Sequence, residues 1–145
     1  MTEDKFWELI KLLNWSETGD DDAVVAPLVY ALSEMPATDI YRFEDILSEK
    51  LWILDTKEHA QATNDWKEHQ SLSSDGFLYE RCCVVANGKS FFEEVLAKPT
   101  LMAQGLEFEP LLYVAHDACE RKAGQVWDHV SAYSYETFSN ALAWD

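Results

Sequence analysis

The sequence predicts an all-α fold, organised as a single compact domain of about six to eight helices over residues 1–145. Apolar residues recur at steps of three and four along most of the chain, which is the spacing of one helical face. No segment alternates apolar and polar residues as a half-buried strand does. The Asp75-Gly76 and Asn87-Gly88 pairs flank helical patterns and do not join two strand-like runs. These observations favour helices throughout.

Two helices are expected before residue 35. The first has Glu3 and Asp4 in its opening turn, where the helix dipole favours negative charge. Its buried face is formed by Phe6, Leu9, Ile10 and Leu13. An acidic loop over residues 16–22 follows, and a second helix should run from about Asp22 to Glu34. Pro27 lies inside that span, so we expect either a kink or a later start.

The third helix has the clearest apolar stripe of the chain. Pro36 interrupts the preceding pattern and Thr38 is a candidate N-cap. The stripe consists of Ile40, Phe43, Leu47, Leu51 and Leu54. Residues 55–70 are polar and rich in helix-forming residues, but their apolar stripe is thin. This stretch is therefore expected to be helical on propensity alone.

The second half of the chain predicts further helices. One should begin around residues 73–76 and stop at Asn87-Gly88. Ser90 and Glu93 have the spacing of a capping box for a short helix that runs to about Lys98. Pro110 suits the first turn of the next helix, which has Gly124 just past its end. Its buried face comprises Leu111, Leu112, Ala115, Ala118 and Cys119. Ser134 is a candidate cap for a last helix that carries Phe138, Ala141 and Leu142.

The charge of the chain restricts its partners. Lys and Arg number 11 against 27 Asp and Glu, which gives a net charge of −16. This balance argues against nucleic-acid binding, which depends on Lys and Arg that neutralise phosphates. It also argues against binding to an anionic membrane surface. Residues 1–58 carry a net charge of −9 and residues 59–145 carry −7, so the excess is not confined to a tail. We therefore expect a folded acidic surface that suits a basic protein partner.

The same sequence predicts a cytoplasmic location. No run of about 18 apolar residues is present for a membrane-spanning helix. The opening residues, Met1 to Asp4, are acidic where a signal peptide would be basic. Three cysteines, two of them adjacent, form a poor disulfide framework and suit a reducing compartment.

No motif for catalysis or for a cofactor is complete. Gly88-Lys89-Ser90 ends like a phosphate-binding loop, but Cys83 stands where that loop needs its first glycine. His116 and Cys119 share a helical spacing that supplies two zinc ligands of the four that a closed site needs. The Asp20-Asp21-Asp22 run lacks the alternating ligands of a calcium loop. We expect no metal, no cofactor and no enzymatic activity, and a metal-dependent hydrolase with His116 and Cys119 is the remotest alternative.

A candidate partner-binding surface combines carboxylates with one aromatic residue. Trp66 lies in a polar stretch, where an aromatic side chain serves either as an interface anchor or as a partly buried contact. The carboxylates are the loop residues Glu17, Asp20, Asp21 and Asp22 together with Asp39, Glu44, Asp45 and Glu49, which we expect to be exposed.

Several motifs together resemble a known bacterial family. The central one is Ser74-Asp75-Gly76-Phe77 followed by Arg81, and it continues through Gly88-Lys89, Phe92-Glu93 and Pro99. The flanking parts are Phe6-Trp7, Met35-Pro36, Ile40 with Phe43, and residues 111–124. This pattern resembles the uncharacterised family called domain of unknown function 4240, over nearly the whole chain up to about Gly124. The resemblance implies a helical fold and no established activity.

The motif admits two readings. Ser74 and Asp75 either line a polar site shared by the family or cap a helix, which by itself explains both residue types. The chain departs from the family just before the motif, where residues 66–73 replace an apolar, alanine-rich stretch and a glycine pair.

The leading functional hypothesis is a non-enzymatic interaction protein, in its sharpest form an immunity protein that neutralises a basic, nuclease-like toxin. The alternative is a regulatory or small-ligand-binding helical domain.

Overall fold

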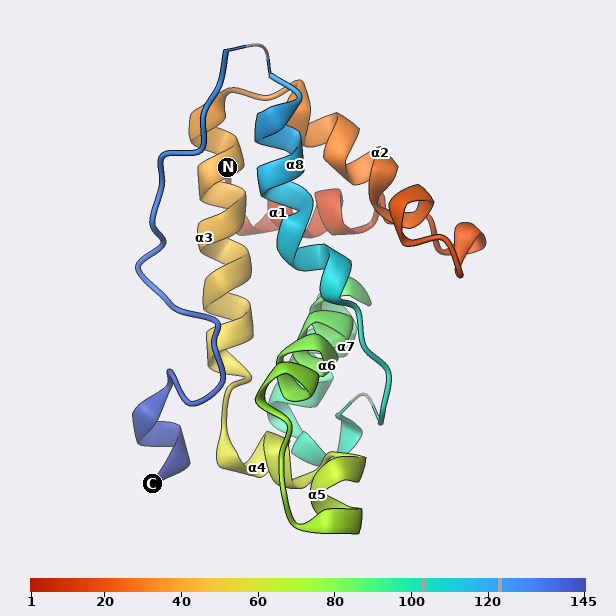
Figure 1. Cartoon of the computed structure of the whole chain (residues 1–145), viewed down its shortest axis with the longest axis vertical. Coiled ribbons are helices and arrows are strands. Elements are labelled where there is room, and N and C mark those ends of the chain that lie inside the picture. The colour runs from red at the N-terminus through yellow and green to blue at the C-terminus, as the bar shows by residue number, and fades with distance from the viewer. Residues whose placement is uncertain (103, 123) are drawn as a thin grey trace. The chain divides into compact units, whose positions relative to one another are not determined.

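The computed structural model describes residues 1–102, 104–122 and 124–145, and it confirms the all-α prediction (Figure 1). Within these residues the chain forms eight α-helices and four short 3₁₀ turns, and no strand. The helices are α1 (Glu3–Ile10), α2 (Asp21–Ser33), α3 (Ala37–Ile53), α4 (Lys57–Gln61), α5 (Asn64–His69), α6 (Ser74–Ala86), α7 (Lys89–Ala97) and α8 (Val114–Glu120). The 3₁₀ turns are η1 (Trp15–Glu17), η2 (Pro99–Leu101), η3 (Glu109–Tyr113) and η4 (Ala141–Trp144).

These elements group into two compact units. Unit 1 comprises Met1–Ile46 and Pro110–Ala132, and unit 2 comprises Leu47–Glu109 and Tyr133–Asp145. Each unit therefore combines a long stretch of the chain with a shorter one that follows much later.

In unit 1 the apolar face predicted for α1 meets the first part of the stripe predicted for α3. Phe6 of α1 and Phe43 of α3 are fully buried, and their ring centroids lie 4.9 Å apart. Helices α2 and α8 pack side by side, and Leu28 of α2 and Ala115 of α8 are fully buried (Figure 1). Burial of these side chains is the main favourable contribution to the stability of the unit.

In unit 2 the core is built around α6 and α7. Val84 of α6 and Val95 of α7 are fully buried. His59 of α4 is buried as well, and its Nε2 donates to the carbonyl of Val95 at 2.9 Å. Because a carbonyl only accepts, the other ring nitrogen, Nδ1, accepts from the Thr56 hydroxyl at 2.6 Å. The neutral imidazole thus joins α4 to α7, and burial lowers the pKa of His59.

In the first half of the chain one predicted helix start is confirmed and another is wrong. Helix α2 begins at Asp21, one residue before the expected start, and it includes Pro27, so the later start is excluded. Thr38 lies inside α3, which begins at Ala37, and is therefore not its cap. The polar stretch 55–70 forms two short helices, α4 and α5, capped by the hydroxyls of Thr56 and Thr63.

The predicted caps of α6 and α7 each lie one or two residues from the real ones. The α6 cap is Ser73, whose Oγ accepts the Gly76 N–H at 3.1 Å, and Ser74 is the first residue of the helix. Helix α7 begins at Lys89 after Gly88, which has φ of 101°. Ser90 therefore lies inside the first turn, so the predicted capping box is wrong.

The last predicted helix is absent. Residues 133–140 are irregular and only η4 follows them. The backbone N–H groups of Phe138 and Asn140 donate to the Asp55 carboxylate and are not available for a helix.

None of the helices in the described part of the chain is long and apolar enough to cross a membrane.

Candidate functional site

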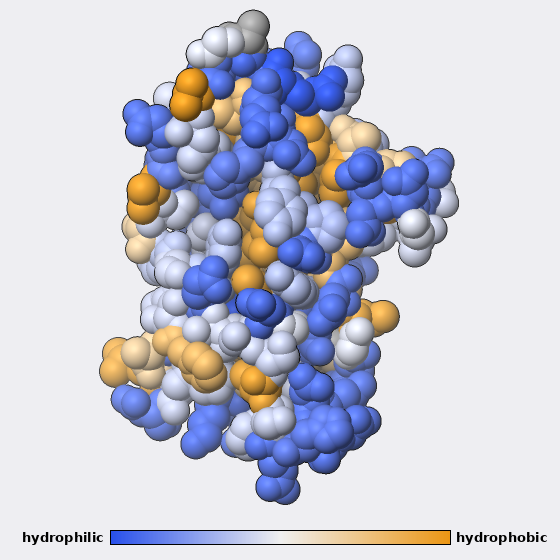
Figure 2. Space-filling view, viewed as in Figure 1, coloured by the Kyte–Doolittle hydropathy of each residue, from blue (hydrophilic) through white to orange (hydrophobic). Residues whose placement is uncertain are grey.

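Four predicted surface carboxylates come together at the start of α2. Glu17 belongs to η1, and Asp20 accepts the Ala23 N–H at 3.2 Å as the α2 N-cap. Asp21 and Asp22 form the first turn, and all four side chains are exposed. Figure 2 shows hydrophilic residues over the segment at the right of the view, where Figure 1 places the beginning of α2. We call these four residues the α2 acidic cluster.

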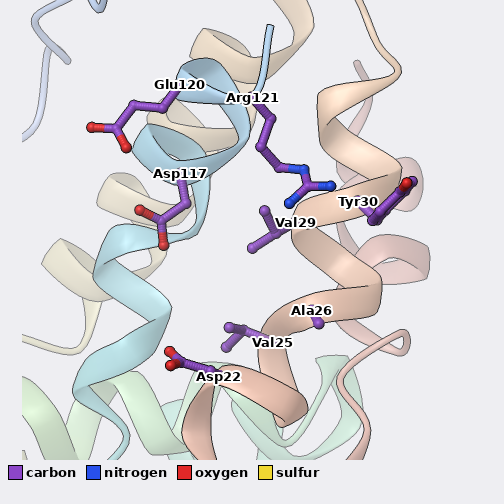
Figure 3. Close-up of a pocket in the computed structure, with 8 residues that line it drawn as sticks. All are labelled: Asp22, Val25, Ala26, Val29, Tyr30, Asp117, Glu120 and Arg121. Atoms are coloured by element: carbon purple, nitrogen blue, oxygen red, sulfur yellow. The ribbon is translucent and has the colours of Figure 1, made fainter.

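A groove between α2 and α8 adjoins this cluster. Its volume is about 460 Å³. The α2 side contributes Asp22 and an apolar wall of Val25, Ala26, Val29 and Tyr30, and the α8 side contributes Asp117, Glu120 and Arg121. Figure 3 shows the Asp22 carboxylate directed from α2 toward α8. The groove thus combines an apolar wall with carboxylates from both helices.

The charges of the groove favour a cationic ligand. Partial burial raises the pKa of Asp117, and the neighbouring Glu120 and Asp22 charges raise it further. The single cation, Arg121, is directed toward α2 (Figure 3), and its guanidinium lies 4.5 Å from the centre of the Tyr30 ring. An ammonium or guanidinium group that entered the groove would relieve the repulsion among the carboxylates.

The other predicted carboxylates have different surroundings. Glu44 is only 5% exposed, so the prediction of exposure is wrong for it. The half-buried Asp45 accepts from His129 Nε2 at 2.6 Å and from Ser131 Oγ at 2.8 Å. Asp39 is half-buried and pairs with the N-terminal amine at 3.1 Å. Asp45 and Asp39 are half-buried because residues 129–131 and the N-terminus lie against them, which the helical period cannot reveal.

Two further predicted residues belong to unit 2. Glu49 lies half-buried on α3 and Trp66 lies half-buried on α5. The Trp66 N–H of the backbone donates to Thr63 Oγ1 at 3.4 Å. The structure thus gathers the loop part of the predicted surface into one cluster but does not add the α3 carboxylates to it.

The residues considered for metal binding serve as packing groups. The His116 ring stacks on the Trp127 ring with 3.8 Å between centroids, and Cys119 is 1% exposed. In the described ranges, no three or more His, Cys, Asp or Glu side chains gather in an arrangement that could hold a metal ion.

The Ser74-Asp75-Gly76-Phe77 motif and Arg81 place two side chains in the core of unit 2. Phe77 and Arg81 are buried, and the guanidinium lies 4.7 Å from the Phe77 ring centre. Ser74 and Asp75 are exposed at the first turn of α6. Ser74 presents its carbonyl to the Thr137 hydroxyl at 2.7 Å.

Sequence reasoning missed Asp55, a carboxylate whose charge favours the charged form of Arg81 in this motif. Asp55 follows α3 and is fully buried, although nothing in its sequence context distinguishes it from a helix-ending residue. The α8 carboxylates of the groove were missed as well, because only tertiary packing brings Asp117 and Glu120 next to α2.

Comparison with known proteins gives a single match. No curated protein and no solved structure matches the chain. A family model described as a protein of unknown function, DUF4240, matches residues 1–121, which include the α2–α8 groove and the α6 motif. The chain therefore belongs to the DUF4240 family.

Proposed function

We propose that this chain is a non-enzymatic interaction protein that binds a basic protein partner through the α2 acidic cluster and the α2–α8 groove. The observation that carries the proposal is the continuity of exposed carboxylates from the cluster into a groove with an apolar wall. Such a surface offers both charge and shape to a Lys or Arg side chain, whose aliphatic stem packs on apolar residues while its head meets carboxylates.

The sharper form of the proposal is an immunity protein that neutralises a basic, nuclease-like toxin. A nuclease carries a cationic surface built for phosphates, and an acidic protein of net charge −16 competes for that surface. Long-range attraction between the two would also accelerate their association. Neutralisation would then require only occlusion and no chemistry by this chain.

The test is binding to the products of the neighbouring genes, measured by isothermal titration calorimetry at low salt. Asp21→Asn/Asp22→Asn is expected to weaken binding of the partner by about ten-fold or more, because charge pairs at a protein interface commonly contribute over 1.4 kcal/mol. The matched control is Glu93→Gln/Glu94→Gln, which removes the same charge from exposed positions on α7. An equal loss in both variants would show that only net charge acts. If no neighbouring gene product binds, the proposal fails.

A second candidate is the binding of a small cationic ligand. The groove volume of about 460 Å³ lies within the range of small-molecule sites. Titration with spermidine and with arginine separates the two candidates. Stoichiometric binding that Asp117→Asn abolishes, without any protein partner, would favour the small-ligand function.

A further inference from the structure

Unit 2 buries two charged side chains that need partners. Asp55, just after α3, and Arg81, in the middle of α6, each have no exposed surface. Moving a carboxylate and a guanidinium out of water is costly unless hydrogen bonds replace their hydration. The identity of those hydrogen-bond partners therefore shows what this part of unit 2 is built to hold.

The partners of Asp55 come from one segment at the end of the chain, residues 133–145. Oδ1 accepts the backbone N–H of Phe138 at 3.1 Å and the indole N–H of Trp144 at 3.0 Å. Oδ2 accepts the backbone N–H of Asn140 at 3.0 Å. A single buried carboxylate thus binds two backbone amides two residues apart and one side chain, all from a segment that turns at residues 137–138.

Arg81 contacts both its own unit and the same segment. Its Nη1 donates to the Leu51 carbonyl at 2.8 Å, and its Nη2 donates to Thr137 Oγ1 at 3.0 Å. The buried Nε has no hydrogen-bond partner. The Thr137 hydroxyl in turn donates a hydrogen bond to the Ser74 carbonyl. The two guanidinium nitrogens that make hydrogen bonds therefore join the end of α3 to the C-terminal segment.

The segment itself contributes little to the apolar core. All of residues 133–145 are half-buried or exposed, and Leu142 is 87% exposed. Phe138 has φ of 77°, a strained value for a residue with a β-carbon, and its ring packs on Trp144. Trp144 also meets Phe77 edge to face at 6.1 Å between centroids. Polar contacts and the ring contacts of Trp144 with Phe77 and of Tyr133 with Trp52, and not deep burial, hold the segment.

The site and its occupant are separate in the sequence. Asp55, Ser74, Phe77 and Arg81 lie inside the region that matches the DUF4240 model, whereas residues 133–145 lie outside it. The family region therefore supplies the carboxylate, the guanidinium and the aromatic ring of Phe77. Residues 133–145 bind to these groups.

We propose that unit 2 has a peptide-binding site centred on Asp55 and Arg81, and that residues 133–145 occupy it as an internal ligand. The partner that fits this site is a segment of another protein that forms a similar turn and presents two backbone N–H groups two residues apart and a tryptophan indole N–H. The tethered segment competes with such a partner at the millimolar effective concentration typical of a short linker. The site is distinct from the α2–α8 groove of unit 1 and does not depend on the function proposed for it.

The experiment uses the full chain and a fluorescein-labelled peptide with the sequence of residues 133–145. Trp144→Ala removes the indole N–H and both ring contacts, so it loosens the internal segment while Asp55 and Arg81 remain. By fluorescence anisotropy this variant should bind the peptide at least about ten-fold more tightly than the native chain does. Leu142→Ala, which alters an exposed residue of the same segment, is the matched control and should behave like the native chain. Equal affinity in Trp144→Ala and in the native chain would overturn the proposal.

Two further measurements test the proposal even if the Trp144→Ala variant does not fold. If Trp144→Ala loses its helical circular dichroism, Thr137→Val takes its place, since it removes only the hydroxyl contacts to Arg81 and Ser74. In the native chain, amide hydrogen exchange should be faster at Phe138 and Asn140 than in the middle of α6, because the segment opens without unfolding the unit. Exchange at the same rate in both places would make the segment a part of the cooperative core and would refute the internal-ligand role.

Discussion

Glu44 shows how a carboxyl group behaves when the core surrounds it. It is 5% exposed, its Oε2 has no hydrogen-bond partner, and its pKa is raised to about 7. Burial is the main cause, and repulsion from Asp45 adds to it. A neutral, protonated carboxyl group is thus the form that the fold accommodates.

This gives a pH-dependent prediction for stability. The folded pKa lies above the unfolded one, so the folded state takes up a proton and stability falls as pH rises from about 4.5 to 7. Glu44→Gln should therefore stabilise the protein at pH 8 by roughly 1–3 kcal/mol and change little at pH 4.5. Thermal unfolding at the two pH values measures this difference. Glu93→Gln, an exposed change on α7, should show no such difference, and a pH-independent effect of Glu44→Gln would contradict the assignment.

Burial raises the pKa of Glu44, whereas it lowers the pKa of His59. Its two ring nitrogens are fully used by Thr56 and Val95 in the neutral state. A proton added to Nδ1 would break the hydrogen bond that the Thr56 hydroxyl donates to this atom. This agrees with the lowered pKa of His59. Burial thus favours the neutral form of both Glu44 and His59.

At the scale of elements, the helix ends depend on residues that the hydrophobic period does not mark. Thr2, Asp20, Thr56, Thr63 and Ser73 each accept a backbone N–H at a helix start. Helix α7 has no such cap and depends on the left-handed conformation of Gly88. Only glycine adopts that conformation without strain.

This difference predicts the effect of two substitutions at the start of α7. Gly88→Ala should lower the free energy of unfolding by about 1–2 kcal/mol, because a β-carbon at φ of 101° is strained although the space around it is open. Ser90→Ala should cost less than about 0.5 kcal/mol, because Ser90 lies inside the exposed first turn and not at the cap. Urea unfolding measures both. A larger loss for Ser90→Ala than for Gly88→Ala would restore the capping-box interpretation.

For the whole molecule, the net charge of −16 determines how stability depends on ionic strength. Carboxylates outnumber Lys and Arg by 27 to 11, and the pairs Lys5–Glu8, Glu68–His69 and Asp45–His129 involve exposed or half-buried side chains. Self-repulsion therefore opposes the folded state at low ionic strength.

Screening should accordingly stabilise the protein. Raising NaCl from 10 to 300 mM shortens the Debye length from about 30 Å to below 10 Å, and the midpoint of thermal unfolding should rise by a few degrees. Scanning calorimetry at fixed pH gives the measurement. The Asp21→Asn/Asp22→Asn variant should rise less, since two of the repelling charges are gone. A fall of the midpoint with salt would mean that attractive pairs dominate.

The single-domain expectation stays a prediction, since the two compact units are described separately. The sequence by itself determined the helical class and the apolar faces of α1, α3 and α8, because burial of one face imposes the helical period on the residues. It also located the α2 acidic cluster, because a run of carboxylates in a loop needs no tertiary partner to be exposed.

Only the tertiary structure decided which charges are buried and what the C-terminal segment does. Glu44 and Asp55 look like ordinary surface carboxylates in the sequence, and residues 134–142 look like a helix. The structure buries both carboxylates and leaves the segment irregular, because contacts between residues some 85 positions apart outweigh local propensity. Hydrogen bonds to a buried charge are strong and directional, and no local pattern in the sequence records them.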